Sequence, residues 1–391
     1  MNELQLPSRI VEALQQALPD NQGFISLHEP TFRGNEWNYV KECLDTGWVS
    51  SAGKYVEDFE LKLAEYTGSP YAIVVSNGTS ALHVCLMLAG VQANDEVLMP
   101  SLTFVATANA VSYCGAVPHF IDVSPVTMGV DPIALDHYLQ DIAVYKDDGA
   151  VYNKQTGRRI AAIVPMHTFG HPVDLDPLME VCERYRITLV EDAAESIGSY
   201  YKGKHTGTFG KLGAVSFNGN KIITTGGGGA ILTSDETLAK AAKHLTTTAK
   251  LPHRWEFHHD QIGYNYRMPN LNAALGCAQL ERLPIMLEQK RTLVNKYAAI
   301  FESILGVSLF MEPSFASSNY WLNAIVLDEP SFELRDQILE VVNNAGLMTR
   351  PIWTPMHELP MFKDCPSMQL PVTNRLAASV INIPSSASLC S

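Results

Sequence analysis

From about residue 70 onward, short apolar runs alternate with segments in which apolar residues recur at helical spacing. The apolar runs at 71–75, 96–99, 117–123, 160–165 and 187–190 are predicted strands, because they are short and rich in β-branched residues. The segments between them include predicted helices at 79–89, 103–113 and 176–185. This alternation predicts an α/β fold with a large, doubly wound and mainly parallel sheet.

Beyond residue 200 the pattern changes. Residues 205–234 are rich in Gly and Thr with short apolar runs, which favours hairpins, and the stretch 147–158 is a predicted inserted turn or hairpin. A long helix is expected at 270–305, broken at Pro284, followed by strands at 320–327 and 347–350 around a helix at 332–344. We therefore expect an N-terminal arm (1–24), a large domain (25–265) and a small α+β C-terminal domain (266–391).

Composition and charge narrow the class of protein. The chain has 391 residues, of which 46% are hydrophobic and 18% charged, as in a well-packed globular protein. A formal net charge of −13 argues against a nucleic-acid partner. The first 20 residues do not have the pattern of a signal peptide, no run approaches the apolar length that a membrane helix requires, and the seven cysteines are scattered without a CxxC pair. We expect a cytoplasmic protein without disulfide bonds, metal site or membrane partner.

A polar turn follows the first predicted strand. Its sequence, Ser-Asn-Gly-Thr-Ser at 76–80, lies between a strand and a helix, where free backbone N–H groups and the positive helix end can hold a phosphate. The turn is therefore a candidate phosphate site. An ordinary capped turn is the alternative.

Two further polar segments follow predicted strands. Glu-Asp-Ala-Ala-Glu at 191–195 comes directly after the strand at 187–190, at the edge of a parallel sheet where ligands bind, although the acid could instead cap a helix. Ser-Phe-Asn-Gly-Asn-Lys at 216–221 precedes four glycines at 226–229. A lone lysine is usually exposed, but four glycines indicate that the backbone passes close to another group or has positive φ.

These features suit one cofactor when they are taken together. Pyridoxal phosphate requires a lysine for its Schiff base, an acid against its pyridine nitrogen and a phosphate site. Asp192 and Lys221 lie 29 residues apart, after the phosphate turn. The glycine run is not a G-x-G-x-x-G dinucleotide fingerprint.

The chain resembles the DegT/StrS-type sugar aminotransferases, which are fold type I pyridoxal-phosphate enzymes. The resemblance covers nearly the whole chain, in order, through Gly-Trp-Val-Ser at 47–50, Gly-Thr-Ser-Ala-Leu at 78–82, Thr-Phe at 103–104, Glu-Asp-Ala-Ala at 191–194, Ser-Phe at 216–217, Lys221 and Asn-Tyr-Arg-Met at 265–268.

The resemblance implies roles for individual residues. Lys221 would form the Schiff base and move the substrate proton, and Asp192 would pair with the pyridinium nitrogen. The remaining cofactor-binding residues implied by it are Gly78, Thr79, Ser80 and Ser216 at or beside the phosphate, Phe104 and Ala194 on the two ring faces, and Glu195, which stands where several relatives have Gln. Asn265 is expected to reach the phosphate of a neighbouring subunit, which implies a homodimer with shared active sites.

The resemblance also suggests a substrate. Three segments, at 151–158, 166–172 and 349–353, look most like the branch that aminates nucleotide-linked 2-acetamido-2,6-dideoxy-4-keto sugars for legionaminic acid or bacillosamine-type glycans, with glutamate as the expected donor. Candidate substrate residues are Trp48, His167, Arg350 and His357. His167 and His171 could also be read as a metal pair, but they have no third ligand.

Three alternatives remain. Perosamine synthases, which act on GDP-linked 4-keto sugars, share much of the pattern. A sugar dehydratase of the same fold is disfavoured, because such relatives have His at the position of Lys221. A cofactor-binding regulatory scaffold is disfavoured because neither Lys221 nor Asp192 is lost.

Overall fold

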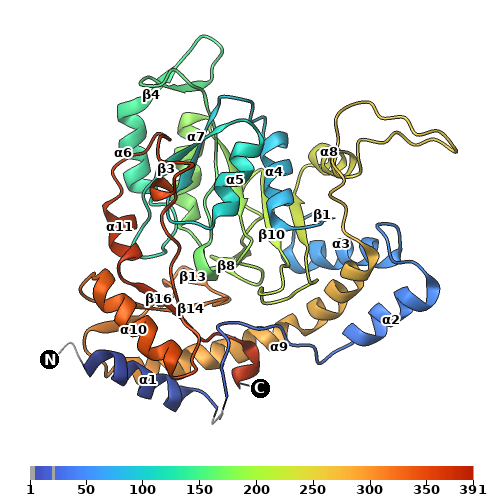
Figure 1. The fold of residues 1–391 in the computed structure, drawn as a ribbon. Coiled ribbons are helices and arrows are strands. Elements are labelled where there is room, and N and C mark those ends of the chain that lie inside the picture. Colours follow the sequence, from blue (N-terminus) through green and yellow to red (C-terminus); the bar gives the residue numbers. More distant parts are fainter. Residues whose placement is uncertain (1–4, 20–22, 391) are drawn as a thin grey trace.

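A seven-stranded sheet forms the centre of the protein, whose computed structural model describes residues 5–19 and 23–390 (Figure 1). The strand order is β1-β11-β10-β7-β6-β2-β3. The pairs from β10 to β3 are parallel, whereas β11 runs antiparallel to both β1 and β10. The strands are β1 (Tyr71–Val75), β2 (Glu96–Pro100), β3 (Val117–Ile121), β6 (Ile160–Ile163), β7 (Thr188–Asp192), β10 (Leu212–Ser216) and β11 (Gly229–Thr233). The expected mainly parallel α/β sheet is confirmed.

Helices cover both faces of this sheet. Val97 and Met99 of β2 face one apolar cluster, whereas Leu98 between them faces another. Alternate side chains of a strand point to opposite faces, so these strands are buried on both sides, which explains their nearly continuous apolar runs. The helices are α4 (Gly78–Leu88), α5 (Val105–Tyr113) and α8 (Glu236–Thr246) on one face, and α3 (Lys54–Thr67), α6 (Pro132–Ile142) and α7 (Leu175–Tyr185) on the other.

A second sheet organises the C-terminal part. It is antiparallel, with the order β12-β14-β16-β15. Its elements are β12 (Val307–Leu309), β14 (Asn323–Leu327), α10 (Phe332–Asn344), β15 (Arg350–Pro351), α11 (Pro371–Ala377) and β16 (Val380–Ile383). The predicted strand at 320–327 begins later than expected, because Tyr320 has a positive φ of 47°, which no strand allows.

The long helix α9 (Asn270–Phe301) connects the two sheets. The expected break at Pro284 is wrong, because the helix runs through it without interruption. Proline removes one backbone donor. Apolar side chains anchor the helix on both sides of that point: Cys277 and Leu283 in the core of the large sheet, and Leu293 and Tyr297 in that of the small sheet. Packing therefore outweighs the lost hydrogen bond.

The N-terminal segment packs against the C-terminal part where it is described. The helix α1 (Leu6–Ala17) lies beside α10 and the C-terminal half of α9 (Figure 1). Ile10 and Leu14 are fully buried in one cluster with Ile325 and Ile381 of the small sheet. Residues 1–4 and 20–22 lie outside the described residues. The domain bounds at 25–265 and 266–391 stay a prediction, and α1 shares the core of the C-terminal part.

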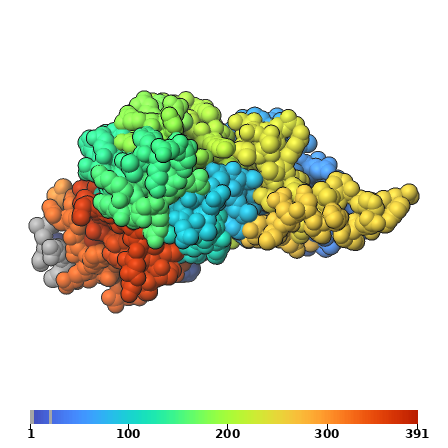
Figure 2. All heavy atoms as spheres, turned by 90° about the horizontal axis from the view of Figure 1, so that it is seen from above, coloured from blue at the N-terminus to red at the C-terminus, as the bar shows by residue number. Residues whose placement is uncertain are grey.

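Shorter elements complete the fold. The inserted segment forms a two-stranded hairpin, as expected. After α8, residues 247–265 form a long hairpin that projects from the body of the protein (Figures 1 and 2). The remaining elements are α2 (Glu36–Thr46), β4 (Ala143–Tyr145), β5 (Val151–Asn153), β8 (Tyr200–Tyr201), β9 (Lys204–His205), β13 (Ala316–Ser317) and the short 3₁₀ helices η2 (Thr168–Gly170), η3 (Met356–Glu358) and η4 (Ala387–Cys390). None of the helices within 5–19 and 23–390 is long and apolar enough to span a membrane.

A buried amine lies where α9 meets the small sheet. The side chain of Lys290 is fully buried, and its Nζ donates to the carbonyl oxygens of Trp321, at 3.1 Å, and Ser385. Burial lowers the pKa of Lys290 to about 7. An unfolded lysine keeps its proton up to about pH 10. Between these two values the unfolded chain binds more protons, so the stability of the folded protein should rise with pH.

We expect the free energy of unfolding to increase between pH 7 and pH 9, with a slope of up to about 1.4 kcal/mol per pH unit from this residue. Lys290→Met should remove that contribution, measured by urea unfolding at each pH. Lys296→Met, on an exposed position of the same helix, is the control and should keep the slope. An equal slope in wild type and Lys290→Met would contradict the assignment.

Candidate active site

A cavity of about 320 Å³ opens at the carboxyl ends of the parallel strands, which is where ligands bind in open α/β sheets. The segments that follow β1, β2, β6, β7 and β10 line it, together with two tryptophans from the C-terminal part. Its lining residues are Asn77, Gly78, Thr79, Leu82, Phe104, Ala106, Met166, Asp192, Ala194, Glu195, Ser216, Asn218, Asn220, Lys221, Trp321 and Trp353. Every expected cofactor-binding residue except Ser80 and Asn265 is among them.

The turn between β1 and α4 forms one wall. The side chain of Asn77 caps α4 by accepting from the backbone N–H of Ser80 at 2.8 Å. The first backbone N–H groups of a helix have no partner within it, so those of Gly78 and Thr79 are available to an anion. The strand end at Ser216 closes the space, because a Cβ on Gly78 would lie 2.9 Å from its Cβ.

The glycine run has a steric reason. A Cβ on Gly229 would lie 2.6 Å from the carbonyl carbon of Asn77, and β11 passes beside this turn through the pairing of Gly229 with Val75. Only glycine permits this approach. The expectation that the backbone passes close to another group is confirmed at Gly229.

Asp192 is the last residue of β7, which ends two residues later than the strand predicted at 187–190. Its Oδ2 accepts from Thr107 Oγ1 at 2.7 Å, and its Oδ1 accepts from the backbone N–H of Ala194 at 3.1 Å. Burial raises the pKa of this carboxyl above its usual range, and the two hydrogen bonds oppose the shift. A cationic partner in the cavity would keep Asp192 ionised. Thr107, which positions it, carried no signal in the sequence.

Lys221 lies in the turn after β10, and its side chain is 11% exposed. Its Nζ is 3.1 Å from Glu195 Oε1 and 3.6 Å from the centre of the Trp321 ring. The indole N–H of Trp321 donates to the carbonyl of Asn220 at 2.7 Å, which fixes the ring beside the lysine. Trp321 comes from the C-terminal part, so local sequence could not indicate it.

His167 does not line the cavity, which corrects one expected substrate contact. Its side chain is fully buried, and its Nδ1 accepts from the N–H of Val173 at 3.2 Å. Nε2 therefore carries the hydrogen and donates to Glu191 Oε2 at 3.0 Å. Glu191 also accepts from the backbone N–H groups of residues 207, 209 and 210. This pair holds the backbone behind the site.

The other expected substrate residues also lie outside this cavity. Trp48 is 60% exposed in the loop after α2, and Arg350 is exposed on β15. His357 Nδ1 lies 2.8 Å from Ser101 Oγ, in η3. Their roles stay a prediction. Trp353, which sequence reasoning missed, lines the cavity instead, with its ring centre 6.4 Å from that of Phe104.

The cavity residues fit pyridoxal 5′-phosphate. Unpaired N–H groups at the start of α4, a buried carboxyl that needs a cation and a shielded lysine amine are the three groups that this cofactor requires. Within the described ranges, no cluster of three or more His, Cys, Asp or Glu side chains is arranged to hold a metal ion. His171 likewise belongs to no such cluster among the described residues, and its two ring nitrogens are buried without a hydrogen-bond partner.

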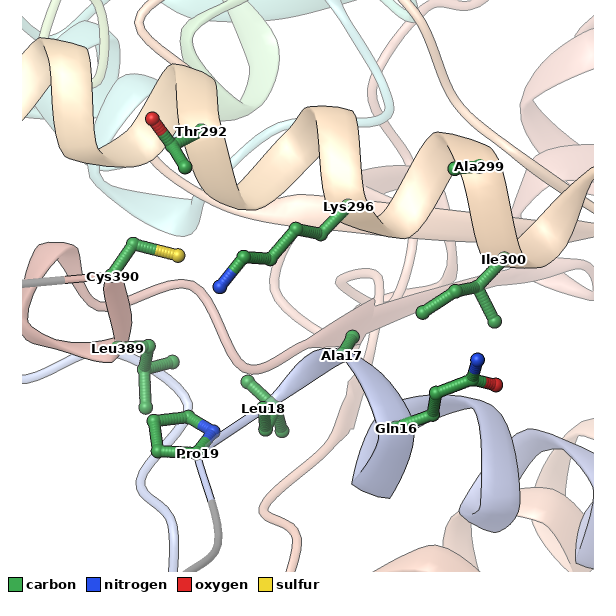
Figure 3. Close-up of a pocket in the computed structure, with 10 residues that line it drawn as sticks. All are labelled: Gln16, Ala17, Leu18, Pro19, Thr292, Lys296, Ala299, Ile300, Leu389 and Cys390. Atoms are coloured by element: carbon green, nitrogen blue, oxygen red, sulfur yellow. The ribbon is translucent and has the colours of Figure 1, made fainter.

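A second cavity, of about 680 Å³, lies between α1, α9 and η4 (Figure 3). Lys296 is the only charged side chain among the described residues that line it, and no carboxylate or histidine faces it there. A site for proton transfer needs an acid or base beside its reacting groups. We therefore assign the chemistry to the cavity around Lys221.

Comparisons with known proteins agree with this geometry. A sequence profile of the DegT/DnrJ/EryC1/StrS aminotransferase family matches residues 30–391, which include every residue lining the Lys221 cavity. The chain is 36% identical to GDP-perosamine synthase of Caulobacter vibrioides over 93% of this chain and 94% of that protein. It is 37% identical to GDP-perosamine synthase of Escherichia coli O157:H7, with 94% of each covered. The aminotransferase TlmJ from Streptoalloteichus hindustanus has a similar structure, with a TM-score of 0.84 and 28% identity over 94% of this chain and 95% of that one.

Asp192→Asn tests the carboxylate. An amide cannot provide the negative charge that a protonated pyridine nitrogen requires, so amino transfer should slow by roughly 10² or more at saturating cofactor. The turnover number is the measurement, and circular dichroism checks that the fold is kept. Glu340→Gln, which removes an exposed carboxylate on α10, is the control and should be unaffected. A normal turnover number in Asp192→Asn would show that another group serves the cofactor.

Proposed function

This chain belongs to the DegT/DnrJ/EryC1/StrS aminotransferase family, and from that premise we propose that it aminates the 4-keto carbon of a GDP-linked 4-keto-6-deoxy sugar. The enzyme is a sugar aminotransferase, and its cofactor is pyridoxal 5′-phosphate. Glutamate is the amino donor in this proposal.

The observation that carries the choice of substrate is the similarity to two GDP-perosamine synthases over almost the whole chain. It favours the alternative drawn from the sequence over the 2-acetamido-2,6-dideoxy sugar that three short segments suggested. Three short segments are weaker evidence of substrate than similarity that extends over more than nine-tenths of both chains.

Different residues of the cavity have different roles in transamination. When bound, the cofactor supplies an electron-withdrawing ring that stabilises negative charge at the substrate carbon. Gly78, Thr79 and Ser216 hold its phosphate, and Asp192 keeps its ring nitrogen protonated. Lys221 Nζ moves the proton to and from the substrate carbon. Phe104 and Trp353 line the cavity with apolar rings, and such surfaces limit the water beside a bound substrate, which strengthens the electrostatic interactions inside.

Two other functions are less well supported. A dehydratase of this fold would need a histidine at the position that Lys221 occupies. A regulatory scaffold would not need an acid and a lysine that face the same cavity, as Asp192 and Lys221 do.

The substrate can be tested with two purified sugars and glutamate. We expect kcat/KM to be about tenfold or more higher for a GDP-linked 4-keto-6-deoxy hexose than for a UDP-linked 2-acetamido-4-keto-2,6-dideoxy hexose, a difference of about 1.4 kcal/mol in transition-state binding. Mass spectrometry of the products gives the rates. Lys221→Ala should form neither product, and borohydride should attach the cofactor to wild type only. Preference for the UDP sugar would reinstate the first interpretation of the sequence.

The proposal includes a homodimer. Large apolar side chains are exposed on two parts of the surface: Trp37 (78%) on α2 and Trp48 (60%) after it, and Trp255 (70%) and Phe257 (80%) on the projecting hairpin. Aromatic side chains of this size are enriched at protein–protein interfaces relative to the rest of the surface. Asn265, at the base of the hairpin, is exposed and absent from the lining of its own chain's cavity, which supports a role in a second copy.

Mixing Lys221→Ala chains with Asn265→Ala chains tests this arrangement. A two-fold interface is reciprocal, so a heterodimer would contain one site that lacks both residues and one that lacks neither. Activity should therefore return from two poor parents, up to about half an intact site per pair of chains in an evenly exchanged mixture. Native mass spectrometry confirms the heterodimer. Heterodimers that are no more active than the parents would show that Asn265 serves its own chain.

A further inference from the structure

The amine of Lys221 contacts two groups, Glu195 and Trp321, and the contact with Trp321 was not expected from the sequence. Glu195 Oε1 is 3.1 Å from Nζ, and the ring centre of Trp321 is 3.6 Å from it. The side chains of the pair are 11% exposed for Lys221 and 2% for Glu195. The contact is therefore shielded from bulk water.

This contact raises a chemical question. An ammonium group has no lone pair, so Lys221 can form a bond to a carbonyl carbon only after its proton has left. In a shielded site the proton must pass to a group in contact. Among the described residues, Glu195 provides the carboxylate that contacts this amine. Asp192, the other acid in the cavity, is engaged by Thr107 and Ala194.

Glu195 is suited to hold a proton. Its Oε2 accepts one hydrogen bond, from the backbone N–H of Phe169 at 2.9 Å, and its Oε1 faces Lys221. Burial raises the pKa of Glu195 to about 7, with the charge of Asp192 acting in the same direction and that of Lys221 against it. On the side of the small sheet, His28 and Lys290 are the further titratable groups close to Lys221 and Trp321.

The neighbouring acid Glu191 shows the contrast. It is also fully buried, but His167 and three backbone N–H groups donate to it and hold its pKa below the usual range despite the burial. Two carboxyls four positions apart therefore differ in their environments, and one stays charged while the other can exchange a proton.

We propose that Glu195 is the base that takes the ammonium proton of Lys221 when the lysine captures the cofactor. The N–H bond breaks and leaves its electron pair on Nζ, while the proton forms an O–H bond at Oε1. A neutral amine and a neutral carboxylic acid result, so the net charge of the pair does not change. Burial favours this exchange because it disfavours an ion pair away from water. The inference rests on Lys221 as the lysine that binds the cofactor.

Capture of pyridoxal phosphate by the apoprotein, without sugar or amino acid, tests the proposal. Above about pH 7 Glu195 is ionised and can accept the proton, so capture by wild type should accelerate as the pH rises through 7. Glu195→Gln cannot titrate, so this step should disappear and capture at neutral pH should slow about tenfold or more. Stopped-flow absorbance gives the rate, and borohydride trapping with peptide mass spectrometry shows that Lys221 has reacted.

Two further variants keep the test decisive. Glu358→Gln, which removes an exposed carboxylate, should behave as wild type. Glu195→Asp retains a titratable group on a shorter side chain, so capture should slow while the pH step remains. If Glu195→Gln does not fold, Glu195→Asp still tests the proposal. The same rate and pH step in wild type and Glu195→Gln, or the loss of the step in Glu195→Asp, would overturn the role of Glu195. Because no sugar is used, these outcomes are independent of the proposed substrate.

Discussion

The pairing between β7 and β10 is the constraint on which the site depends. These strands are parallel neighbours, and Asp192 lies opposite Ala214 in their register. The backbone N–H of Ala193 extends the pairing by donating to the carbonyl of Ala214 at 2.9 Å. Both strands therefore end at the same edge of the sheet, and the segments that follow them, which carry Glu195 and Lys221, meet at that edge. A shift of one residue would turn Asp192 to the opposite face and remove it from the cavity.

Much of this edge could be predicted from the sequence, because its signals are local. Gly78, Asp192 and Ser216 each follow or end an apolar run, and the carboxyl ends of parallel strands meet at one edge whatever the order of the strands. The glycine run was informative for a similar reason. Gly229 is required because its backbone contacts Asn77, a residue that is distant in the chain, but the glycine itself can be recognised in the sequence.

The parts that could not be predicted depend on partners that are far apart in the chain. His167 was misassigned because its partner Glu191 lies in another strand segment, and a polar residue looks functional until its hydrogen bonds are known. Pro284 was read as a break because the pattern does not reveal that both halves of α9 are anchored in apolar cores. Trp321 and Trp353 reach the cavity from the C-terminal part, and no local motif predicts such a contact.

These tryptophans tie the chemistry of Lys221 to the packing of the whole chain. Trp321 donates to Asn220 beside Lys221, and its carbonyl accepts from Lys290 on α9. Since α9 is anchored in the cores of both sheets, the position of the indole ring depends on how the two sheets pack together. A cavity whose walls come from both parts exists only while that packing is intact. A ligand that binds this cavity but does not bind the unfolded chain therefore stabilises the packing of the two sheets against each other as well as the groups that it contacts.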